Sequence, residues 1–527
     1  MNPVRNSNRS KNMRHEPNIS NGVNRRVFIK SVGFGAAAFS LPGFGSAKQS
    51  QSFEPSSLRA QRSNLRRSQG EPRNDRKKPN FLFILADDFG WSQLGCYGSS
   101  FYETPNIDRL AAEGMRFTDA YAACPVCSPT RAGIMTGKYP ARLHLTDFIA
   151  GGSFPYEKYK QPQWQKYLPL EETTIAEVLK TAGYTTASFG KWHLSIAKKP
   201  PESLPYNPDK QGFDESIITY KPASNHDPES DAHNVEIITE KSLEFLQKNK
   251  DNPFFLYVPH NTIHSPILGK KKLIEKYKNK PGAGLPRNNP IVAAMIEDLD
   301  NSVGRLLQKL DELKIADKTI VVFFGDNGGL ESSNKQTPLR SGKANLYEGG
   351  IREPLIVRWP PVVQPGSTCS EPVISVDFFP TFLEILGLKN KAGKSIDGVS
   401  LLPLLTQSGT LNRQAIYWHY PHYHSSSIGP CGAVRKGDYK LLEWFDETIC
   451  GAGNEFELYN LKQDIGEQYN LAKKMPEKTR ELKELLANWR NNVNAQMLTP
   501  NPNYNPQKAK KSKEQKITYG KDSHHMF

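Results

Sequence analysis

Three features are scarce or missing in this sequence of 527 residues. Its apolar run at residues 32–44 is too short to span a bilayer, so no stable membrane span is expected. The formal net charge is +15, yet residues 1–78 carry +12 and residues 506–527 carry +4, which leaves −1 for residues 79–505. The basic charge thus lies in two tails, and a nucleic-acid partner is not expected. Of six cysteines, only Cys431 and Cys450 flank an expected hairpin and could pair in an oxidising compartment.

The first 78 residues are typical of a targeting segment followed by a linker. Arg25 and Arg26 precede a large apolar pair and Lys30, and a short apolar run without acidic residues leads to small residues at 45–47. This order is similar to a twin-arginine (Tat) export signal. A basic patch before a weak membrane helix is the alternative, which the short run disfavours. We expect a Tat-type signal region in residues 1–47, a disordered basic linker in 48–78, and a periplasmic or secreted bacterial protein.

From residue 79 onward the pattern is that of an α/β protein. Continuous apolar or β-branched runs predict buried strands at residues 81–86, 184–190, 253–258, 319–324 and 354–359. Amphipathic spacing predicts helices at residues 171–181, 235–247, 291–315 and 376–386. We assign residues 79–408 to one large domain. Residues 409–495 predict a smaller α+β subdomain, with strands at 415–419, 432–436 and 439–444 and a helix at 477–493, and residues 496–527 a disordered basic tail.

Oxygen-bearing side chains follow two of the predicted strands. Asp87 and Asp88 come directly after residues 81–86, and Asp326 and Asn327 come after residues 319–324. Ligands of α/β sheets collect at the carboxyl ends of such strands. Aspartates there are either hydrogen-bonding turn residues or ligands of a hard cation, and a single Asp-Asp pair does not decide between these. Three carboxylates and one amide, without histidine or cysteine, suit Ca²⁺ or Mg²⁺ far better than zinc.

One stretch, residues 125–137, specifies a reactive position. Pro129 follows Cys127 by two residues and biases Ser128 away from helical geometry, so that a helix can start at this point. Cys127 would then lie at a helix N-terminus, which favours an anion, and Arg131 would lie one turn into the helix. A buried cysteine on a loop is the alternative for a lone cysteine.

Residues 125–137 resemble the signature of the type I sulfatases, in which this cysteine is oxidised to formylglycine. Residues 183–193, which end in Lys191 and His193, resemble the second signature of the same family. The resemblance extends over residues 79–495. It implies an alkaline-phosphatase-like sulfatase fold, which is a large mixed β-sheet flanked by helices with a smaller C-terminal α+β subdomain. It also implies a maturation enzyme that generates the formylglycine.

The resemblance assigns roles to individual residues. It places the formylglycine at Cys127, with Arg131 and Lys191 holding its hydrate, and makes His193 the base of the second step. His264 and Lys343 would face the bridging oxygen and protonate the leaving alcohol. The implied ligands of the cation, which is Ca²⁺ with Mg²⁺ as the alternative, are Asp87, Asp88, Cys127, Asp326 and Asn327.

Four further residues are weaker candidates for contacts with substrate. His260 fits the family pattern before a proline less well than His264 does, and a histidine at a strand end is more often a structural hydrogen-bonding residue. Arg340 precedes Lys343. His419 and His422 lie in residues 417–424, which are dense in aromatic rings and histidines. Such a stretch forms either a packed domain interface or a rim on which sugars stack.

The predicted function is hydrolysis of sulfate esters of a sulfated carbohydrate by an exported enzyme. The first alternative is a phosphodiester or phosphonate monoester hydrolase of the same superfamily. The sequence lacks the Asp/His set of a two-zinc phosphatase. The second alternative is an inactive glycan-binding relative. Every candidate catalytic position is filled in this sequence, which counts against that alternative.

Overall fold

The computed structural model describes residues 78–196, 204–388, 395–446 and 455–510. The chain divides into two compact units, Met1–Asp75 and Arg76–Phe527, and the described residues all belong to the second. The predicted signal region and all of the predicted linker except residue 78 lie outside the described residues, as does Cys450. None of the helices within these four ranges is long and apolar enough to cross a membrane.

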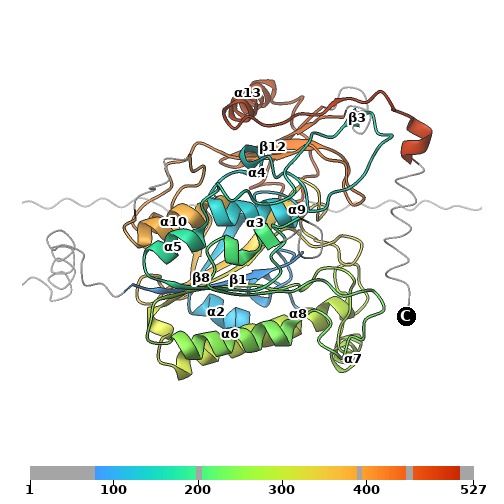
Figure 1. The fold of residues 1–527 in the computed structure, drawn as a ribbon. Coiled ribbons are helices and arrows are strands. Elements are labelled where there is room, and N and C mark those ends of the chain that lie inside the picture. The colour runs from blue at the N-terminus through green and yellow to red at the C-terminus, as the bar shows by residue number, and fades with distance from the viewer. Residues whose placement is uncertain (1–77, 197–203, 389–394, 447–454, 511–527) are drawn as a thin grey trace, which may run out of the picture. The chain divides into compact units, whose positions relative to one another are not determined.

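A mixed sheet of nine strands forms the centre of the large domain (Figure 1). The strand order is β10-β2-β8-β7-β1-β6-β4-β5, and β9 pairs with β2. Neighbours from β7 to β5 are parallel, whereas β8 is antiparallel to both β7 and β2. The strands are β1 Asn80–Ala86, β2 Met115–Tyr121, β4 Thr185–Gly190, β5 Glu215–Ile218, β6 Phe254–Pro259, β7 Thr319–Gly325, β8 Arg352–Arg358, β9 Ser367–Cys369 and β10 Val373–Ile374.

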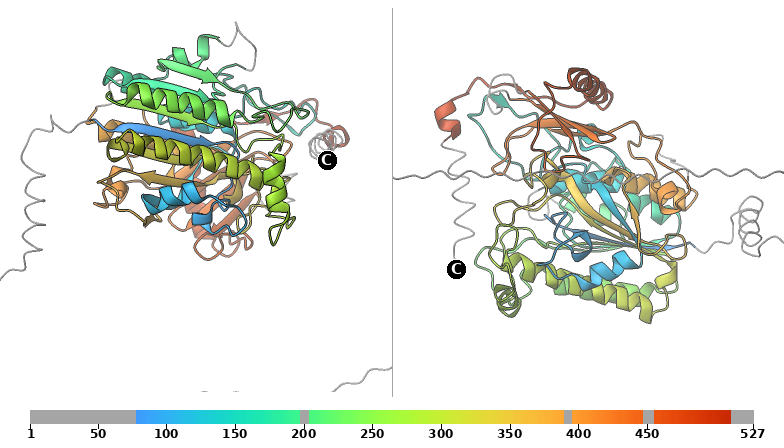
Figure 2. Two further views of the ribbon diagram at one scale, coloured as in Figure 1. Left: turned by 90° about the horizontal axis from the view of Figure 1, so that it is seen from below. Right: turned by 180° about the vertical axis from the view of Figure 1, so that it is seen from behind.

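Helices cover both faces of this sheet, which explains why β1 and β7 are apolar after their first residue. Every residue of β1 and of β7 is buried. Phe81 and Phe83 of β1 pack among side chains of α3 Cys127–Thr136, α5 Ile175–Thr181 and α10 Phe378–Ile385. Leu82 and Ile84 pack on the opposite face, against α2 Pro105–Ala112, α6 Val235–Asn249 and α8 Pro290–Glu312. Figure 2 shows α6 and α8 side by side over that face. The predicted α/β class is therefore confirmed.

The shorter helices connect these layers. They are α4 Pro140–Leu143, α7 Lys271–Lys278, α9 Glu348–Ile351 and α11 Leu402–Leu405. The predicted helix at residues 171–181 begins only at Ile175, because Thr174 is its N-cap. Thr174 accepts a hydrogen bond from the backbone of Glu177, whose side chain accepts one from the backbone of Thr174. This reciprocal pair is the expected capping box.

The smaller subdomain is an antiparallel sheet with one long helix. Its strands are β11 Ile416–Tyr420, β12 Cys431–Lys436, β13 Tyr439–Trp444 and β14 Phe456–Asn460, and its helix is α13 Pro476–Asn492. Trp418 is buried, and its indole N–H donates to Ala122 O at 2.8 Å, beyond the end of β2. The ring of Tyr417 stacks on Trp489 of α13 at 5.0 Å. These contacts favour the interface interpretation of residues 417–424.

The segment after the subdomain differs from the predicted disordered tail. β15 Thr499–Pro500 pairs with β3 Tyr159–Lys160. The Asn501 side chain donates to Pro155 O at 3.0 Å and to Glu157 O at 2.7 Å. The prediction of disorder from residue 496 is therefore wrong for residues 496–510. Backbone pairing with a distant loop leaves no local sequence pattern.

Candidate active site

Neighbouring parallel strands bring the predicted residues to one edge of the sheet. β7, β1, β6 and β4 are adjacent and run in the same direction. Asp326 follows β7, Asp87 follows β1, and Lys191 follows β4. The backbone N–H of Asp326 donates to Ala86 O at 3.0 Å, and that of Lys191 donates to Pro259 O at 2.8 Å. Backbone hydrogen bonding between neighbouring strands therefore continues past the strand ends. It fixes the backbone positions from which the side chains of Asp326 and Lys191 extend.

Cys127 is the first residue of α3, as the sequence predicts. Val126 before it is extended, and Gly137 ends the helix in the left-handed region, with its N–H donating to Gly133 O at 2.9 Å. Cys127 is buried. Its sulfur and one carboxylate oxygen each from Asp87 and Asp326 lie within 4.8 Å of one another. The helix N-terminus thus points residue 127 at the carboxylates.

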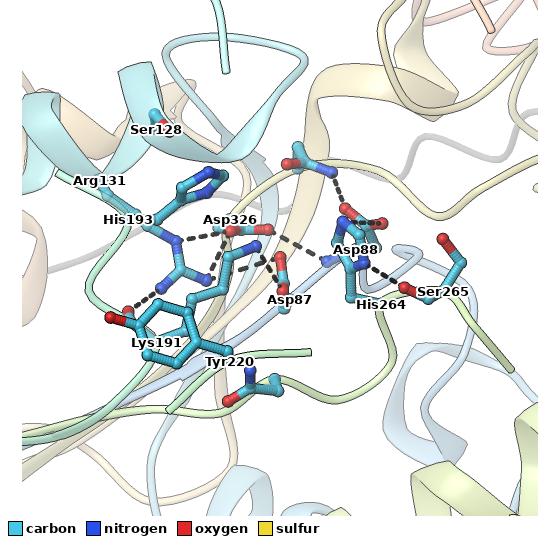
Figure 3. A network of polar contacts seen from close by, with 12 residues as sticks. Asp87, Asp88, Ser128, Arg131, Lys191, His193, Tyr220, His264, Ser265 and Asp326 are labelled. Carbon is cyan, nitrogen blue, oxygen red and sulfur yellow. Dashed lines mark hydrogen bonds and ion pairs between the residues drawn. The ribbon is translucent and has the colours of Figure 1, made fainter. Parts of the chain in front are cut away.

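Three basic side chains balance the three carboxylates, and Figure 3 shows two of them, Arg131 and Lys191, beside Asp87 and Asp326. Arg131 Nε and Nη2 donate to Asp326 Oδ2 at 2.9 and 2.7 Å, and Arg131 Nη1 donates to Lys191 O at 2.5 Å. Lys191 Nζ donates to Asp87 Oδ2 at 2.6 Å. Lys343, which lies 255 residues away from Asp88, donates to both of its carboxylate oxygens at 2.6 and 2.7 Å.

Burial and neighbouring charge act in opposite directions on the pKa values. Burial alone would raise the pKa of Asp87, but the charges of Lys191, His264 and Arg131 outweigh it and hold that pKa below its usual range. Asp88 behaves in the same way because of Lys343. Asp326 lies beside Asp87 in addition to being buried, and its pKa is raised. A metal cation bound between Asp87, Asp88 and Asp326 would favour the ionised form of all three carboxylates.

The donor atoms fit a hard cation. Asp87 Oδ1 and Asn327 Oδ1 are both buried, and neither makes a hydrogen bond in the part of the chain that the structure describes. Asn327 uses its Nδ2 group to donate to Asp88 Oδ1 at 2.8 Å, so its carbonyl oxygen remains available. Oxygen atoms left without donors are the ligands that Ca²⁺ and Mg²⁺ take. Asp87, Asp88, Asp326 and Asn327 could therefore hold such an ion.

His193 has one ring nitrogen available as a base. Its Nε2 lies 2.5 Å from Ile149 O, which can only accept, so Nε2 carries the proton. Nδ1 is buried and makes no hydrogen bond within the described residues. Burial and the charge of Lys191 lower the pKa of His193 to about 3. The imidazole is therefore neutral, with an unshared lone pair on Nδ1.

His264 lies near Asp88. Its Nδ1 donates to Ser265 O at 2.6 Å, and its Nε2 lies 3.7 Å from Asp88 Oδ2. Burial and the charge of Lys343 lower the pKa of His264 to about 3. Burial opposes the charge on Lys343, but Asp88 and other anions outweigh it and raise the pKa of that lysine. Of this pair, Lys343 holds its proton more firmly.

The four weaker candidates have other surroundings. The ring of His260 is buried, with Nε2 3.4 Å from Ser302 Oγ of α8, on the helical layer behind the sheet. Arg340 lies over the ring of Tyr347 at 3.8 Å and donates to Glu467 O at 2.7 Å. His419 is buried against Gln496 O at 2.8 Å. These contacts give each of the three side chains a partner within the protein, and a contact with substrate stays a prediction for them.

His422 is also buried, but it belongs to a polar cluster that supports the site. His422 Nε2 lies 2.8 Å from Thr146 Oγ1, and Nδ1 lies 4.0 Å from Asp147 Oδ2. Tyr420 donates to Asp147 Oδ1 at 2.9 Å. The same loop carries Ile149, whose carbonyl orients His193. His422 therefore contacts this loop, and its predicted contact with substrate stays a prediction. Sequence patterns indicate only that residues 143–152 lie near the site, since the cluster joins two distant segments.

Comparison with known proteins agrees with this geometry. The family model described as "Sulfatase" matches residues 79–388, and the one described as "N-sulphoglucosamine sulphohydrolase, C-terminal" matches residues 342–492. The fold and these matches define a sulfuric ester hydrolase. The chain belongs to the sulfatase family, as a type I sulfatase of the alkaline phosphatase superfamily.

Similar proteins share most of the chain. A "Sulfatase" of Formosa agariphila is 32% identical over 482 residues, which cover 76% of this chain and 85% of that protein. Human arylsulfatase A is 32% identical over 466 residues, covering 78% of this chain and 87% of the relative. Human N-acetylgalactosamine-6-sulfatase is 31% identical over 385 residues, covering 67% and 70%.

Solved structures include the crystal structure of Ps i-CgsB, which superimposes with a TM-score of 0.68 at 26% identity. The superposition covers 86% of this chain and all of that one. A second structure of Ps i-CgsB contains k-i-k-neocarrahexaose and superimposes with a TM-score of 0.67 at 25% identity, covering 86% of this chain and 100% of the other. The predicted mixed-sheet fold with a small C-terminal subdomain is confirmed.

Proposed function

We propose that the protein is an exported sulfatase that hydrolyses sulfate esters of a sulfated carbohydrate, with formylglycine at position 127 and a divalent cation. One observation carries the proposal. The first residue of α3, the carboxylates of Asp87 and Asp326, and Lys191 converge at one buried point. The sulfur of Cys127 lies within 4.8 Å of a carboxylate oxygen of Asp87 and of Asp326, which supports a nucleophile at this position.

The modification and the ion each supply one chemical function. Hydrated formylglycine has two hydroxyl groups on one carbon, so one can attack sulfur and deprotonation of the other can expel sulfate. A cation bound there would supply Lewis-acid polarisation of the sulfate oxygens and would lower the pKa of the attacking hydroxyl. Asp87, Asp88, Asp326 and Asn327 would hold it. Ca²⁺ is the ion we propose, with Mg²⁺ as the alternative that the same oxygen ligands admit.

The side chains of this chain provide the proton transfers. Neutral His193 has its lone pair on Nδ1 and can take a proton from the hydroxyl group of residue 127. Lys343 and His264 lie on the Asp88 side of the site, where the leaving alcohol would depart. Because its pKa is raised, Lys343 stays protonated and can donate that proton to the bridging oxygen as the alcohol leaves. Arg131 and Lys191, which pair with the carboxylates of Asp326 and Asp87 in the same site, would hold residue 127 and offset its charge.

The names of the relatives support a sugar substrate. One relative is an N-acetylgalactosamine-6-sulfatase, and one structural neighbour holds a neocarrahexaose. Two further parts of the proposal rest on the sequence. The twin arginines support Tat export to the periplasm or medium, and Cys127 within its signature supports a maturation enzyme as a partner.

Turnover of a chromogenic ester tests the proposal. The protein is produced together with a formylglycine-generating enzyme and assayed with 4-nitrophenyl sulfate and with a phenylphosphonate monoester, each with added calcium. We expect sulfate ester hydrolysis that Cys127→Ser abolishes. Faster hydrolysis of the phosphonate would favour the alternative reaction. No turnover of either ester by protein that carries formylglycine would contradict the proposal.

A further inference from the structure

The loop after β5 brings two side chains with no assigned role to the active site. β5 pairs with β4 in the register that sets Gly190 opposite Ile218, and the N–H of Thr219 then donates to Gly190 O at 3.0 Å. Residues 220 and 221 therefore leave the sheet beside the segment that carries Lys191. Figure 3 shows the ring of Tyr220 projecting in front of Lys191.

Hydrogen bonds anchor this loop, while the side chains of Tyr220 and Lys221 remain exposed. Asn234 Nδ2 donates to Tyr220 O at 2.9 Å, and Thr219 Oγ1 donates to Asn261 Oδ1 at 2.5 Å. Both bonds anchor the loop without using the ring of Tyr220, whose side chain is 67% exposed. Lys221 is exposed as well. A large exposed aromatic ring on an anchored loop needs an explanation, and a sugar face is a suitable partner.

Lys221 is a cation without an anion among the residues that the structure describes. It makes no ion pair or hydrogen bond there, whereas the exposed Lys270 and Lys276 each contact a carboxylate. Partial desolvation lowers the pKa of Lys221, and repulsion from Lys343 and Lys191 lowers it further, despite attraction from Asp88 and Asp87. The ammonium group of Lys221 therefore lies within electrostatic range of the charged groups of the site.

The charge balance of the site indicates what Lys221 would bind. The three carboxylates are already matched by Arg131, Lys191 and Lys343. A divalent cation adds two positive charges, which the scissile sulfate and the ionised nucleophile offset. Lys221, an exposed residue on the loop after β5, adds one more positive charge within electrostatic range of the site. A substrate with a second anionic group would supply the missing partner.

We propose that Tyr220 and Lys221 form a subsite for a sugar that carries a second sulfate besides the scissile one. Tyr220 stacks on the sugar ring, and Lys221 binds the second sulfate. This inference rests on the proposed function and specifies its substrate class.

Competition between two matched sugars tests the subsite. Galactose 6-sulfate and galactose 2,6-disulfate are measured as competitors of 4-nitrophenyl sulfate hydrolysis, in the unmodified sequence and in Lys221→Gln, Lys221→Arg and Tyr220→Ala. We expect the disulfated sugar to bind about fivefold more tightly than the monosulfated one, which corresponds to an exposed charge pair. Lys221→Gln removes that preference, Lys221→Arg keeps it, and 0.5 M salt weakens it because screening is strong there. Tyr220→Ala lowers the affinity for both sugars severalfold without changing the ratio of the two affinities.

Matched controls separate a local effect from a general one. Lys462→Gln removes an exposed lysine of the small subdomain, and Tyr469→Ala removes a tyrosine that is 70% exposed on the turn after β14. Both controls should keep the preference and both affinities. The inference is overturned if the unmodified sequence shows no preference, or if Lys221→Gln retains it. Calorimetric titration of the two sugars into Cys127→Ser tests the subsite without turnover, so its result stands even if 4-nitrophenyl sulfate hydrolysis fails.

Discussion

Replacing Arg131 by methionine should destabilise the protein strongly when no divalent ion is present. The guanidinium group is completely buried and lies 2.7 Å from Asp326 Oδ2 and 3.6 Å from Asp87 Oδ1. Methionine keeps most of the apolar stem but removes the charge and three hydrogen bonds. Asp326 would then keep a buried carboxylate with no donor for Oδ2.

The magnitude follows from the burial of the pair. Breaking a buried ion pair by removing one partner costs about 3–5 kcal/mol, because it leaves an uncompensated charge. Unfolding entropy of roughly 2.1 cal/mol/K per residue makes 1 kcal/mol equal to about 1 °C for a folded unit of about 400 residues. The thermal midpoint should therefore fall by about 3–5 °C in EDTA. Calcium should reduce the loss, since the ion would neutralise the same carboxylates.

Differential scanning calorimetry with EDTA and with calcium measures both effects. Arg305→Met is the matched control, because Arg305 pairs with Glu236 at 2.9 Å and with Glu240 on the surface, where a pair contributes about 0–1 kcal/mol. The reasoning would be refuted if Arg131→Met lowered the midpoint no more than this control does. It would also be refuted if calcium failed to narrow the difference.

Three further outcomes are expected. Burial, opposed by the hydrogen bond from Tyr420, raises the pKa of Asp147 to about 7, so the stability that this group contributes is complete below its unfolded pKa and is lost as pH rises from about 4 to 7. Denaturation across that range should show that the free energy of unfolding of Asp147→Asn rises relative to that of the wild-type protein by at most about 4 kcal/mol. A difference that stays constant with pH would contradict this. Gly190 has a φ of +138°, and a Cβ there would lie 2.0 Å from Pro259 O, so Gly190→Ala should lower both the thermal midpoint and the rate of 4-nitrophenyl sulfate hydrolysis. Gly437→Ala is the control, because Gly437 also has a positive φ, +58°, but has open space around it, so this change should cost only about 1–2 kcal/mol and leave the hydrolysis rate unchanged. Equal effects of the two changes would refute the argument. Chelation should abolish hydrolysis and calcium restore it, and full activity in EDTA would exclude the proposed ion.

The elements that the sequence predicts well are those with strong local patterns. β1 and β7 are uninterrupted apolar runs, and the start of α3 is marked by Pro129 and its end by Gly137. The capping box of α5 is an equally clear local pattern. Because parallel strands share one carboxyl edge, the convergence of Asp87 with Asp326 follows from the positions of these residues after two apolar runs.

Other elements carry no such pattern. β2 is part-polar, since its residues alternate between buried and half-buried positions beside the short strand β9, and it was missed. β15 was missed because its pairing partner β3 is distant in the sequence. β14 was missed although it pairs with β13, the strand directly before it. Density of aromatic rings at residues 417–424 could not separate packing from sugar binding, and His419 and His422 are both buried. The position of Lys221 depends on the β4–β5 register, which no single segment encodes.

The mass of one tryptic peptide tests the central claim most directly. Cleavage after Arg116 and Arg131 releases residues 117–131, which contain both Cys124 and Cys127. The protein is purified from its native bacterium, alkylated and digested. We predict a peptide in which Cys124 is alkylated and residue 127 has exchanged H₂S for oxygen, giving the aldehyde. A peptide with two alkylated thiols would contradict the proposed nucleophile.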